Sequence, residues 1–280
     1  MNQTAHSPVW FVTGCSTGFG RHIAEYVLAQ GYRVVVTARK PEQLKDLQNK
    51  GEALVLPLDV TDPRQAKTAI ESAEAAFGAV DVLVNNAGVG YFASVEESDL
   101  NQVRQMMDVN FYGVANMLQA ALPGMRQRRQ GIIVNLTSIG GLCGFPAVGY
   151  YCASKFAVEG LSETLRQEVA PLGIHVMTVE PSAFRTEWAG SAHETPHTHE
   201  DYAPTAGAAI KAYHQSIGRQ PGDPARAAAA IFNAVESQEK PARLLLGNSA
   251  VECALGKLDE LARDFGDWEA VSRGADYPGR

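Results

Sequence analysis

Long apolar runs are absent from the 280-residue sequence, and no stretch approaches the roughly 20 residues that cross a bilayer. The opening residues, Met1–Pro8, hold neither a basic segment nor a small-residue cleavage site, so no export signal is expected. Cysteine is scarce as well, and the four present show no Cys-x-x-Cys spacing, which argues against a disulfide framework or a zinc site. We therefore expect no membrane span, reduced thiols and a cytoplasmic location.

Positive charge is in deficit, because 24 lysines and arginines face 31 aspartates and glutamates. The resulting net charge of -7 would repel a nucleic-acid backbone, so no nucleic-acid partner is expected. Three histidines, His193, His197 and His199, are close enough in sequence to suggest a metal site, but their segment is rich in Thr and Pro and lacks cysteine. We expect these histidines to lie in solvent and predict no metal.

Short β-branched segments alternate with amphipathic segments of helical length from residue 9 to about residue 180, and a last pair follows. The expected strands are mostly apolar on both faces, as buried parallel strands are: Val9–Thr13, Arg33–Ala38, Ala53–Pro57, Val82–Asn85, Ile132–Leu136, His175–Glu180 and Arg243–Leu246. The expected helices are Arg21–Gln30, Pro63–Phe77, Leu100–Met125, Tyr151–Ala170 and Pro224–Gln238. This alternation predicts an α/β fold in one domain, residues 1–280, with a doubly wound parallel sheet of about seven strands and helices on both faces.

The periodicity fails between Pro181 and Gly222. We expect an irregular loop over about residues 182–222, and long loops of this kind in compact domains often cover a substrate. Simple surface disorder is the alternative.

A glycine-rich segment links the first expected strand to the first expected helix. Glycines allow a tight turn and a close approach to a pyrophosphate, and the helix N-terminus offers free N–H groups to it. In this position the segment predicts a dinucleotide site in a Rossmann-type fold. The residues expected to bind the cofactor here are Gly14, Ser16, Thr17, Gly18, Phe19 and Gly20.

Tyr151 and Lys155 lie four residues apart on an expected helix, so their side chains share one face. A nearby ammonium favours the phenolate of a tyrosine, which makes the phenol a better acid or base. Ser138 follows the strand Ile132–Leu136, at the sheet edge where ligands bind in such folds. Tyr150 is the rival phenol, but its partner four residues on is Ser154, which carries no charge.

The Gly-x-x-x-Gly-x-Gly spacing, the segment Asn85-Asn86-Ala87-Gly88 and the Ser138, Tyr151, Lys155 set resemble the short-chain dehydrogenase/reductase family over about Val9–Thr186. The likeness is strongest to its retinol and hydroxysteroid dehydrogenase-like members. It implies that Tyr151 is the general acid or base, that Ser138 binds the substrate oxygen, and that Lys155 also holds the nicotinamide ribose. Asn110 would hold a water that relays protons to the lysine, with a helix-bending hydrogen bond as the plainer alternative.

The same resemblance extends the expected cofactor site. Asp59 and Val60 would border the adenine, although Asp59 could instead be only a turn residue before Pro63. Further expected contacts are Asn86, Ala87, Gly88, Pro181 and Thr186. Ser182 stands where the family usually has glycine, which puts the path of the following loop in doubt.

The residue at the end of the second strand commonly decides between NAD and NADP, because an acid there binds the ribose 2′-hydroxyl. Here that position is Ala38, followed by Arg39 and Lys40, whose charges suit a 2′-phosphate. We expect NADP(H) to be preferred and NAD(H) to be possible. A solvated loop arginine is the alternative role of Arg39.

These features predict a NAD(P)-dependent oxidoreductase that interconverts an alcohol and a ketone or aldehyde, acting on a small and hydrophobic molecule. The expected pocket residues are Tyr91, Phe92, Gly140 to Phe145, Phe184 and Trp188, any of which could equally be core. Two other functions stay open: a non-catalytic NADP(H)-sensing binding protein, and a nucleotide-sugar epimerase or dehydratase. The family resemblance further implies a homodimer or homotetramer formed through the long helices after the fourth and fifth strands.

Overall fold

The computed structural model describes residues 7–196 and 199–277. Over these residues, seven parallel strands form one sheet in the order β3-β2-β1-β4-β6-β7-β9. Their bounds are β1 (Val9–Val12), β2 (Arg33–Ala38), β3 (Ala53–Pro57), β4 (Val82–Asn85), β6 (Gly131–Leu136), β7 (Ile174–Pro181) and β9 (Arg243–Leu246). The expected doubly wound parallel sheet is therefore confirmed, and each expected strand lies within one residue of its predicted end.

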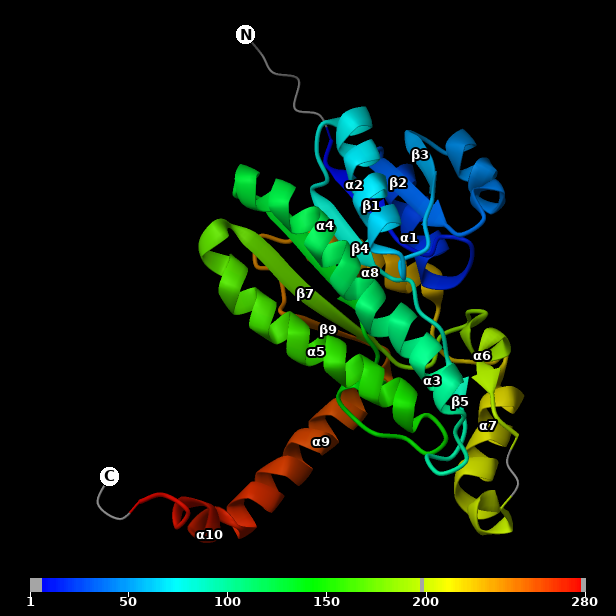
Figure 1. Ribbon diagram of the computed structural model, residues 1–280, viewed down its shortest axis with the longest axis vertical. Coiled ribbons are helices and arrows are strands. Elements are labelled where there is room, and N and C mark those ends of the chain that lie inside the picture. Colours follow the sequence, from blue (N-terminus) through cyan, green and yellow to red (C-terminus); the bar gives the residue numbers. More distant parts are fainter. Residues whose placement is uncertain (1–6, 197–198, 278–280) are drawn as a thin grey trace.

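Helices cover both faces of this sheet (Figure 1). On one face α1 (Gly18–Ala29) and α8 (Pro224–Glu236) pack against a core that includes Trp10, Val34 and Val36. The other face carries α2 (Pro63–Phe77), α4 (Gly113–Arg128) and α5 (Gly149–Val169). Strand residues alternate between the two cores, which is why the strands had to be apolar on both faces.

Two helix starts follow the capping logic of their sequences. The Asp62 carboxylate accepts a hydrogen bond from the Arg64 backbone N–H at 2.9 Å, and Asp223 accepts one from Ala225 at 2.8 Å. In both helices a proline occupies the first helical position, where its missing N–H costs nothing.

The helix expected over Leu100–Met125 is not continuous. It consists of α3 (Leu100–Met107), a π-helical turn η2 (Asp108–Tyr112) and α4. Single π turns inside α-helices often occur at functional sites, and this one contains Asn110.

The expected irregular loop, residues 182–222, contains more structure than its sequence suggested. It holds α6 (Trp188–Ser191), β8 (His193–Glu194), η5 (Glu200–Tyr202), η6 (Ala203–Gly207) and α7 (Ala208–Ser216). β8 pairs with β5 (Tyr91–Phe92). Short elements with few turns leave little periodicity to detect, and here tertiary contacts define them.

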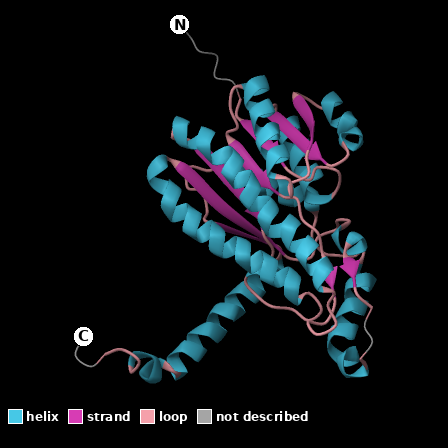
Figure 2. Ribbon diagram, in the orientation of Figure 1, coloured by secondary structure: helices cyan, strands magenta, loops and turns pink. Residues whose placement is uncertain are grey.

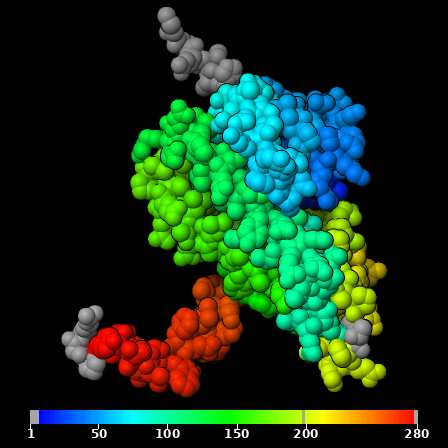
Figure 3. Space-filling model, in the orientation of Figure 1, coloured from blue at the N-terminus to red at the C-terminus, as the bar shows by residue number. Residues whose placement is uncertain are grey.

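The remaining elements are short or terminal. The short turns η1 (Pro41–Asn49), η3 (Ile139–Gly141) and η4 (Ala170–Leu172) connect the main elements, and α9 (Asn248–Asp267) and α10 (Glu269–Arg273) end the described chain. α9 starts against the rest of the molecule and then extends away from it, as Figures 1 and 2 show. Much of its length is exposed in the space-filling view of Figure 3. No helix of the described residues is long and apolar enough to cross a membrane.

Candidate active site

A cavity of about 1300 Å³ opens at the carboxyl ends of the strands, where α/β sheets bind ligands. The loops after β1, β2, β3, β4, β6 and β7 line it, together with parts of α5, α6, α7 and α9. Its volume exceeds the 300–1,000 Å³ or so typical of a small-molecule pocket, so a dinucleotide and a second ligand fit together.

The glycine loop forms one end of the cavity. α1 begins at Gly18, three residues before the start expected from the sequence, so the loop and the first helical turn are one structure. Gly14 (φ 71°) and Gly18 (φ 59°) adopt the left-handed conformation that favours glycine. A Cβ on Gly20 would lie 2.4 Å from the Gly14 carbonyl oxygen and 2.4 Å from Asn86 Nδ2. Gly20 does not line the cavity; its role is to let the loop close.

Hydrogen bonds from neighbouring strands hold this loop in place. Asn86 Nδ2 donates to the carbonyls of Thr13 at 2.8 Å and Gly14 at 3.1 Å. The Thr13 hydroxyl accepts from the backbone N–H groups of Asn86 (2.9 Å) and Ala87 (3.0 Å). Thr13 was expected only as a strand end. The available signal for this second role was a hydroxyl at the end of an apolar strand, directly before the glycine loop.

The N-terminus of α1 fits a pyrophosphate. Thr17 is its N-cap residue but makes no side-chain capping hydrogen bond, and the first turn contains no acidic residue. The N–H groups of that turn therefore face the cavity without a competing side-chain acceptor. The expected contacts Gly14, Ser16, Thr17, Gly18 and Phe19 all line the cavity.

The far side of the cofactor region is charged. Arg39 and Lys40 follow β2, are exposed and make no ion pair within the described residues. Asp59 also borders the cavity, but its Oδ1 accepts from the Thr61 N–H at 3.0 Å and the Thr61 hydroxyl at 2.8 Å. Asp59 therefore has the turn role that the sequence allowed, and it also lies on the cavity wall, where the adenine contact was expected. Val60 lies next to it on the cavity wall.

Ser138, Tyr151 and Lys155 meet in the middle of the cavity. Burial raises the pKa of the Tyr151 phenol far above its ordinary value, and a hydrogen bond with the Ser138 side chain opposes this rise. Lys155 Nζ lies 5.7 Å from the centre of the Tyr151 ring and donates to the Leu136 carbonyl at 3.0 Å. Burial lowers the pKa of Lys155 to about 8, while the negative charge of Glu159 acts in the opposite direction. Tyr150 is not part of the cavity wall.

Asn110 lies behind this set and is fully buried. Its Nδ2 donates to the Val89 carbonyl at 3.0 Å and to Ser154 Oγ at 3.1 Å, and its Oδ1 accepts from the Val89 N–H at 2.8 Å. A Cβ on Gly88 would lie 3.3 Å from Asn110 Oδ1 and 3.6 Å from Lys155 Nζ. The π turn and Gly88 thus bring Asn110 close to the lysine, and its side chain locks the segment after β4.

The end of β7 and the segment after it reach the cavity despite the serine at 182. Pro181 and Thr186 line the cavity, and Thr186 Cβ would be 3.5 Å from a Cβ on Gly18. The Ser182 N–H donates to the Leu246 carbonyl at 2.9 Å, so the chain continues the β7–β9 pairing for one residue past the strand. The serine is accommodated by the sheet.

Aromatic side chains form the part of the cavity beside Tyr151. Trp188 lies 4.9 Å from the Tyr151 ring, centre to centre, and lines the cavity with Phe145, Phe184 and Gly140. Tyr91 and Phe92 follow the core alternative that the sequence left open, because both are buried and neither lines the cavity. Phe92 packs against Trp188 and Tyr213 (5.6 and 5.1 Å between ring centres) and supports them from below.

The wall residues that the sequence analysis did not predict include Tyr213 on α7, and Ser249 and Cys253 on α9. The apolar spacing of Ala250 and Ala254 at the start of α9 was the available signal. The described residues contain no group of His, Cys, Asp and Glu that could hold a metal. His197, one of the three histidines considered for zinc, lies outside the described residues.

The fold is a doubly wound parallel sheet. The cavity at the carboxyl ends of its strands contains a glycine loop that leads into a free helix N-terminus, together with a serine, a tyrosine and a lysine. These features define a dinucleotide-dependent oxidoreductase. The family model described as short chain dehydrogenase matches residues 8–197. The chain therefore belongs to the short-chain dehydrogenase family and is an oxidoreductase of that family.

The chain is 40% identical over 267 residues to oxidoreductase BOA17 of Botryotinia fuckeliana, covering 94% of this chain and 97% of the relative. It is 39% identical over 238 residues to 3-ketodihydrosphingosine reductase of Bacteroides thetaiotaomicron, covering 84% and 86%. Estradiol 17-beta-dehydrogenase 1 of Rattus norvegicus is 39% identical over 197 residues, 64% of this chain and 55% of the relative. The expected resemblance to hydroxysteroid dehydrogenase-like members of the family is thus confirmed.

Solved structures agree. A short-chain dehydrogenase from Streptomyces avermitilis superposes with a TM-score of 0.89 at 42% identity, covering 97% of this chain and 100% of that one. A relative from Burkholderia phymatum, in complex with NAD, gives 0.83 at 25% identity, covering 92% and 95%. One from Burkholderia cenocepacia, in complex with NADP, gives 0.74 at 25% identity, covering 94% and 97%. Structures of this fold therefore bind NAD or NADP.

Proposed function

We propose that this protein is an NADPH-preferring carbonyl reductase and alcohol dehydrogenase that acts on a hydrophobic secondary alcohol or its ketone or on an aldehyde. The observation that carries the proposal is one continuous cavity in which the glycine loop adjoins Ser138, Tyr151 and Lys155, and beyond them an aromatic wall.

The N–H groups at the start of α1 would hold the pyrophosphate, and Lys155 would hold the nicotinamide ribose. Pro181 and Thr186 would contact the carboxamide end, with Asp59 and Val60 at the adenine. Arg39, exposed at the end of β2 and without an ion-pair partner in the described residues, would bind the 2′-phosphate. When bound, the nicotinamide supplies or accepts the hydride.

The protein's own part is to orient the substrate oxygen and move a proton at it. The Ser138 hydroxyl donates a hydrogen bond to that oxygen, and the Tyr151 hydroxyl gives it a proton in the direction of reduction. The Lys155 ammonium stabilises the phenolate that remains, which matters because burial disfavours that charge. Asn110 fixes the backbone of Val89 near Lys155, where a proton-relaying water would bind.

The part of the cavity beside Tyr151 would hold an apolar substrate. Phe145, Trp188, Phe184 and Val148 line it, and residues 182–222 would act as its cover. Two of the relatives are named for ketone or hydroxyl chemistry on a sphingoid base and a steroid, which are both hydrophobic. We extend that class, but neither individual substrate, to this chain.

The first test follows nicotinamide absorbance while NADPH and then NADH are offered with aliphatic, aromatic and steroid-like ketones. Turnover with NADPH exceeding that with NADH supports the proposal. Tyr151→Phe is expected to lower kcat at least 100-fold, because general acid–base catalysis contributes about 10²–10⁴-fold. Tyr150→Phe is the matched control, since it removes a neighbouring phenol outside the cavity. Unchanged turnover in Tyr151→Phe would refute the assignment, and tight NADPH binding without turnover would favour a redox-sensing protein.

We also propose a homodimer or homotetramer in a reducing cytoplasm. Tyr112 and Phe156, on η2 and α5, are exposed at 55% and 45% and would be covered by pairing of α4 and α5 between copies. All four cysteines are free thiols, which fits the compartment. A monomer mass in sedimentation at micromolar concentration would contradict the assembly.

A further inference from the structure

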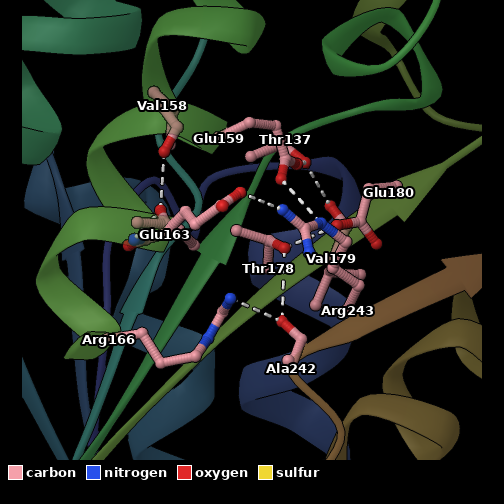
Figure 4. A network of polar contacts seen from close by, with 12 residues as sticks. Thr137, Val158, Glu159, Glu163, Arg166, Thr178, Val179, Glu180, Ala242 and Arg243 are labelled. Atoms are coloured by element: carbon pink, nitrogen blue, oxygen red, sulfur yellow. Dashed lines mark hydrogen bonds and ion pairs between the residues drawn. The ribbon is translucent and has the colours of Figure 1, made fainter. Parts of the chain in front are cut away.

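Two glutamates lie side by side behind the catalytic residues, in the polar network of Figure 4. Glu159 is on α5 and is 6% exposed, while Glu180 is on β7 and is fully buried. Buried carboxylates are costly unless each is paired with donors or cations. This pair therefore needs an explanation.

One oxygen of each carboxyl group has a donor. The Thr137 hydroxyl donates to Glu159 Oε1 at 2.5 Å, and the Thr178 hydroxyl donates to Glu180 Oε1 at 2.5 Å. The two Oε2 atoms are buried and have no hydrogen-bond donor from another described group. The two carboxyl groups are nevertheless close enough for the charge of Glu159 to raise the pKa of Glu180. Two acceptors can bond only if a proton lies between them.

The surrounding charges do not neutralise both carboxylates. Arg243 on β9 faces the pair, with its Nε 3.5 Å from Glu159 Oε2, but its Nη2 donates to Glu163 at 2.7 Å. Arg166 on α5 uses its guanidinium for the carbonyls of Val176 and Ala242. Lys155 is a further cation whose charge interacts with Glu159. Burial, and then the charge of Glu159, raise the pKa of Glu180 to about 7.

Glu159 is linked to the catalytic centre in two ways. Tyr151, Lys155 and Glu159 recur at four-residue intervals on α5, so they share one helix face, and the Glu159 charge raises the pKa of Lys155. Its bond to Thr137 also fixes the residue directly before Ser138. A Cβ on Gly141 would lie 3.1 Å from Glu159 Cγ, so the turn after Ser138 rests on this side chain.

We propose that Glu159 and Glu180 share one proton, and that Glu159 is a positioning residue that sets the charge of Lys155 and the placement of Ser138. This inference rests on the proposed roles of Lys155 and Ser138. With one proton between the two groups, Glu159 carries only part of a negative charge. Loss of the Glu159 carboxylate therefore destabilises the ammonium form of Lys155, whereas loss of the Glu180 carboxyl group leaves that carboxylate in place.

The test compares two isosteric substitutions through the pH dependence of kcat/KM for NADPH-dependent ketone reduction. In Glu159→Gln the amide donates to the Glu180 carboxylate and leaves no charge at 159. The pKa of Lys155 falls, and the alkaline limb of the profile moves to lower pH by about one unit. In Glu180→Gln the Glu159 charge that acts on Lys155 is kept, and the wild-type pair has already lost its shared proton above pH 7, so the limb moves by less than in Glu159→Gln.

Glu163→Gln is the matched control. It removes a carboxylate from the same helix and the same arginine, but one that is 59% exposed and eight residues from Lys155. We expect its alkaline limb to stay in place. A purely structural role for the buried pair would lower kcat/KM in both buried variants without moving the alkaline limb of Glu159→Gln, and that result would overturn the proposal.

A second measurement does not depend on turnover. Infrared spectra of the wild-type protein at pH 6 should show a protonated-carboxyl C=O band that shifts in D₂O and is lost in Glu180→Gln but retained in Glu163→Gln. Absence of this band in the wild type would refute the shared proton. Because this spectrum needs only the wild-type protein, the test holds even if a glutamine variant fails to fold. If the band is present while Tyr151→Phe retains turnover, the proposed function fails and the proton-sharing pair stands.

Discussion

Gly20→Ala tests whether the glycine loop is limited by space. Gly20 is in the first turn of α1, and an exposed helical glycine usually gains about 0.5–1 kcal/mol of stability on change to alanine. Here the added Cβ would lie 2.4 Å from both the Gly14 carbonyl oxygen and Asn86 Nδ2, well inside van der Waals contact. Overpacking of this kind costs about 1–3 kcal/mol.

Displacement of Asn86 adds to that cost, because its two hydrogen bonds to Thr13 and Gly14 are each worth about 1 kcal/mol. We expect Gly20→Ala to lose about 2 kcal/mol of unfolding free energy. The distorted loop should also raise the Kd for NADPH at least tenfold, which corresponds to about 1.4 kcal/mol.

The assay combines denaturant unfolding with titration of NADPH fluorescence. Gly256→Ala is the control, because Gly256 is an exposed residue inside α9 and a Cβ there meets nothing within 4 Å. It should be neutral or slightly stabilising, with unchanged affinity. Wild-type stability and wild-type NADPH affinity in Gly20→Ala would refute the reasoning from close approach.

Two further predictions concern charge. Arg39→Ala should raise the Kd for NADPH at least tenfold and leave that for NADH within about twofold, because only NADPH has the 2′-phosphate; equal losses for both cofactors would remove Arg39 from that role. Burial raises the pKa of Glu180 from 4.5 to about 7 in the folded protein. Between these pH values the folded state therefore binds more protons than the unfolded state, and the stability that comes from protonated Glu180 is lost as pH rises through 7. The Tm of Glu180→Gln relative to wild type should therefore rise from pH 5 to pH 8, and a constant difference would contradict the raised pKa.

The sheet and the cofactor loop could be predicted because their signals are local. About ten residues are enough to recognise a β-branched strand such as Arg33–Ala38, or a glycine loop between a strand and a helix. Tyr151 and Lys155 were also predictable, since helical spacing alone places them on one face.

The features that the sequence could not show depend on contacts between distant segments. Tyr91 and Phe92 looked like pocket residues because aromatic side chains suit both a cavity wall and the core beneath it. Packing against α3 buries Tyr91, and packing against α6 and α7 buries Phe92. The meeting of Glu159 with Glu180 joins a helix to a strand 21 residues later, and no periodicity within either element indicates it. The helical segments of residues 182–222 are too short for a hydrophobic period to be read.

The π turn at Asp108–Tyr112 changes the direction in which the side chains of α3 point relative to those of α4. Each residue of an α-helix advances the side chain by about 100°, so the one extra residue in the π turn rotates α3 by that angle relative to α4. Val103 and Met106 can thus face Tyr91 while Met117 and Ala121 face the sheet. Deletion of a single residue from the turn would restore a regular α-helix, but it would rotate α3 by about 100° and move Val103 and Met106 away from Tyr91.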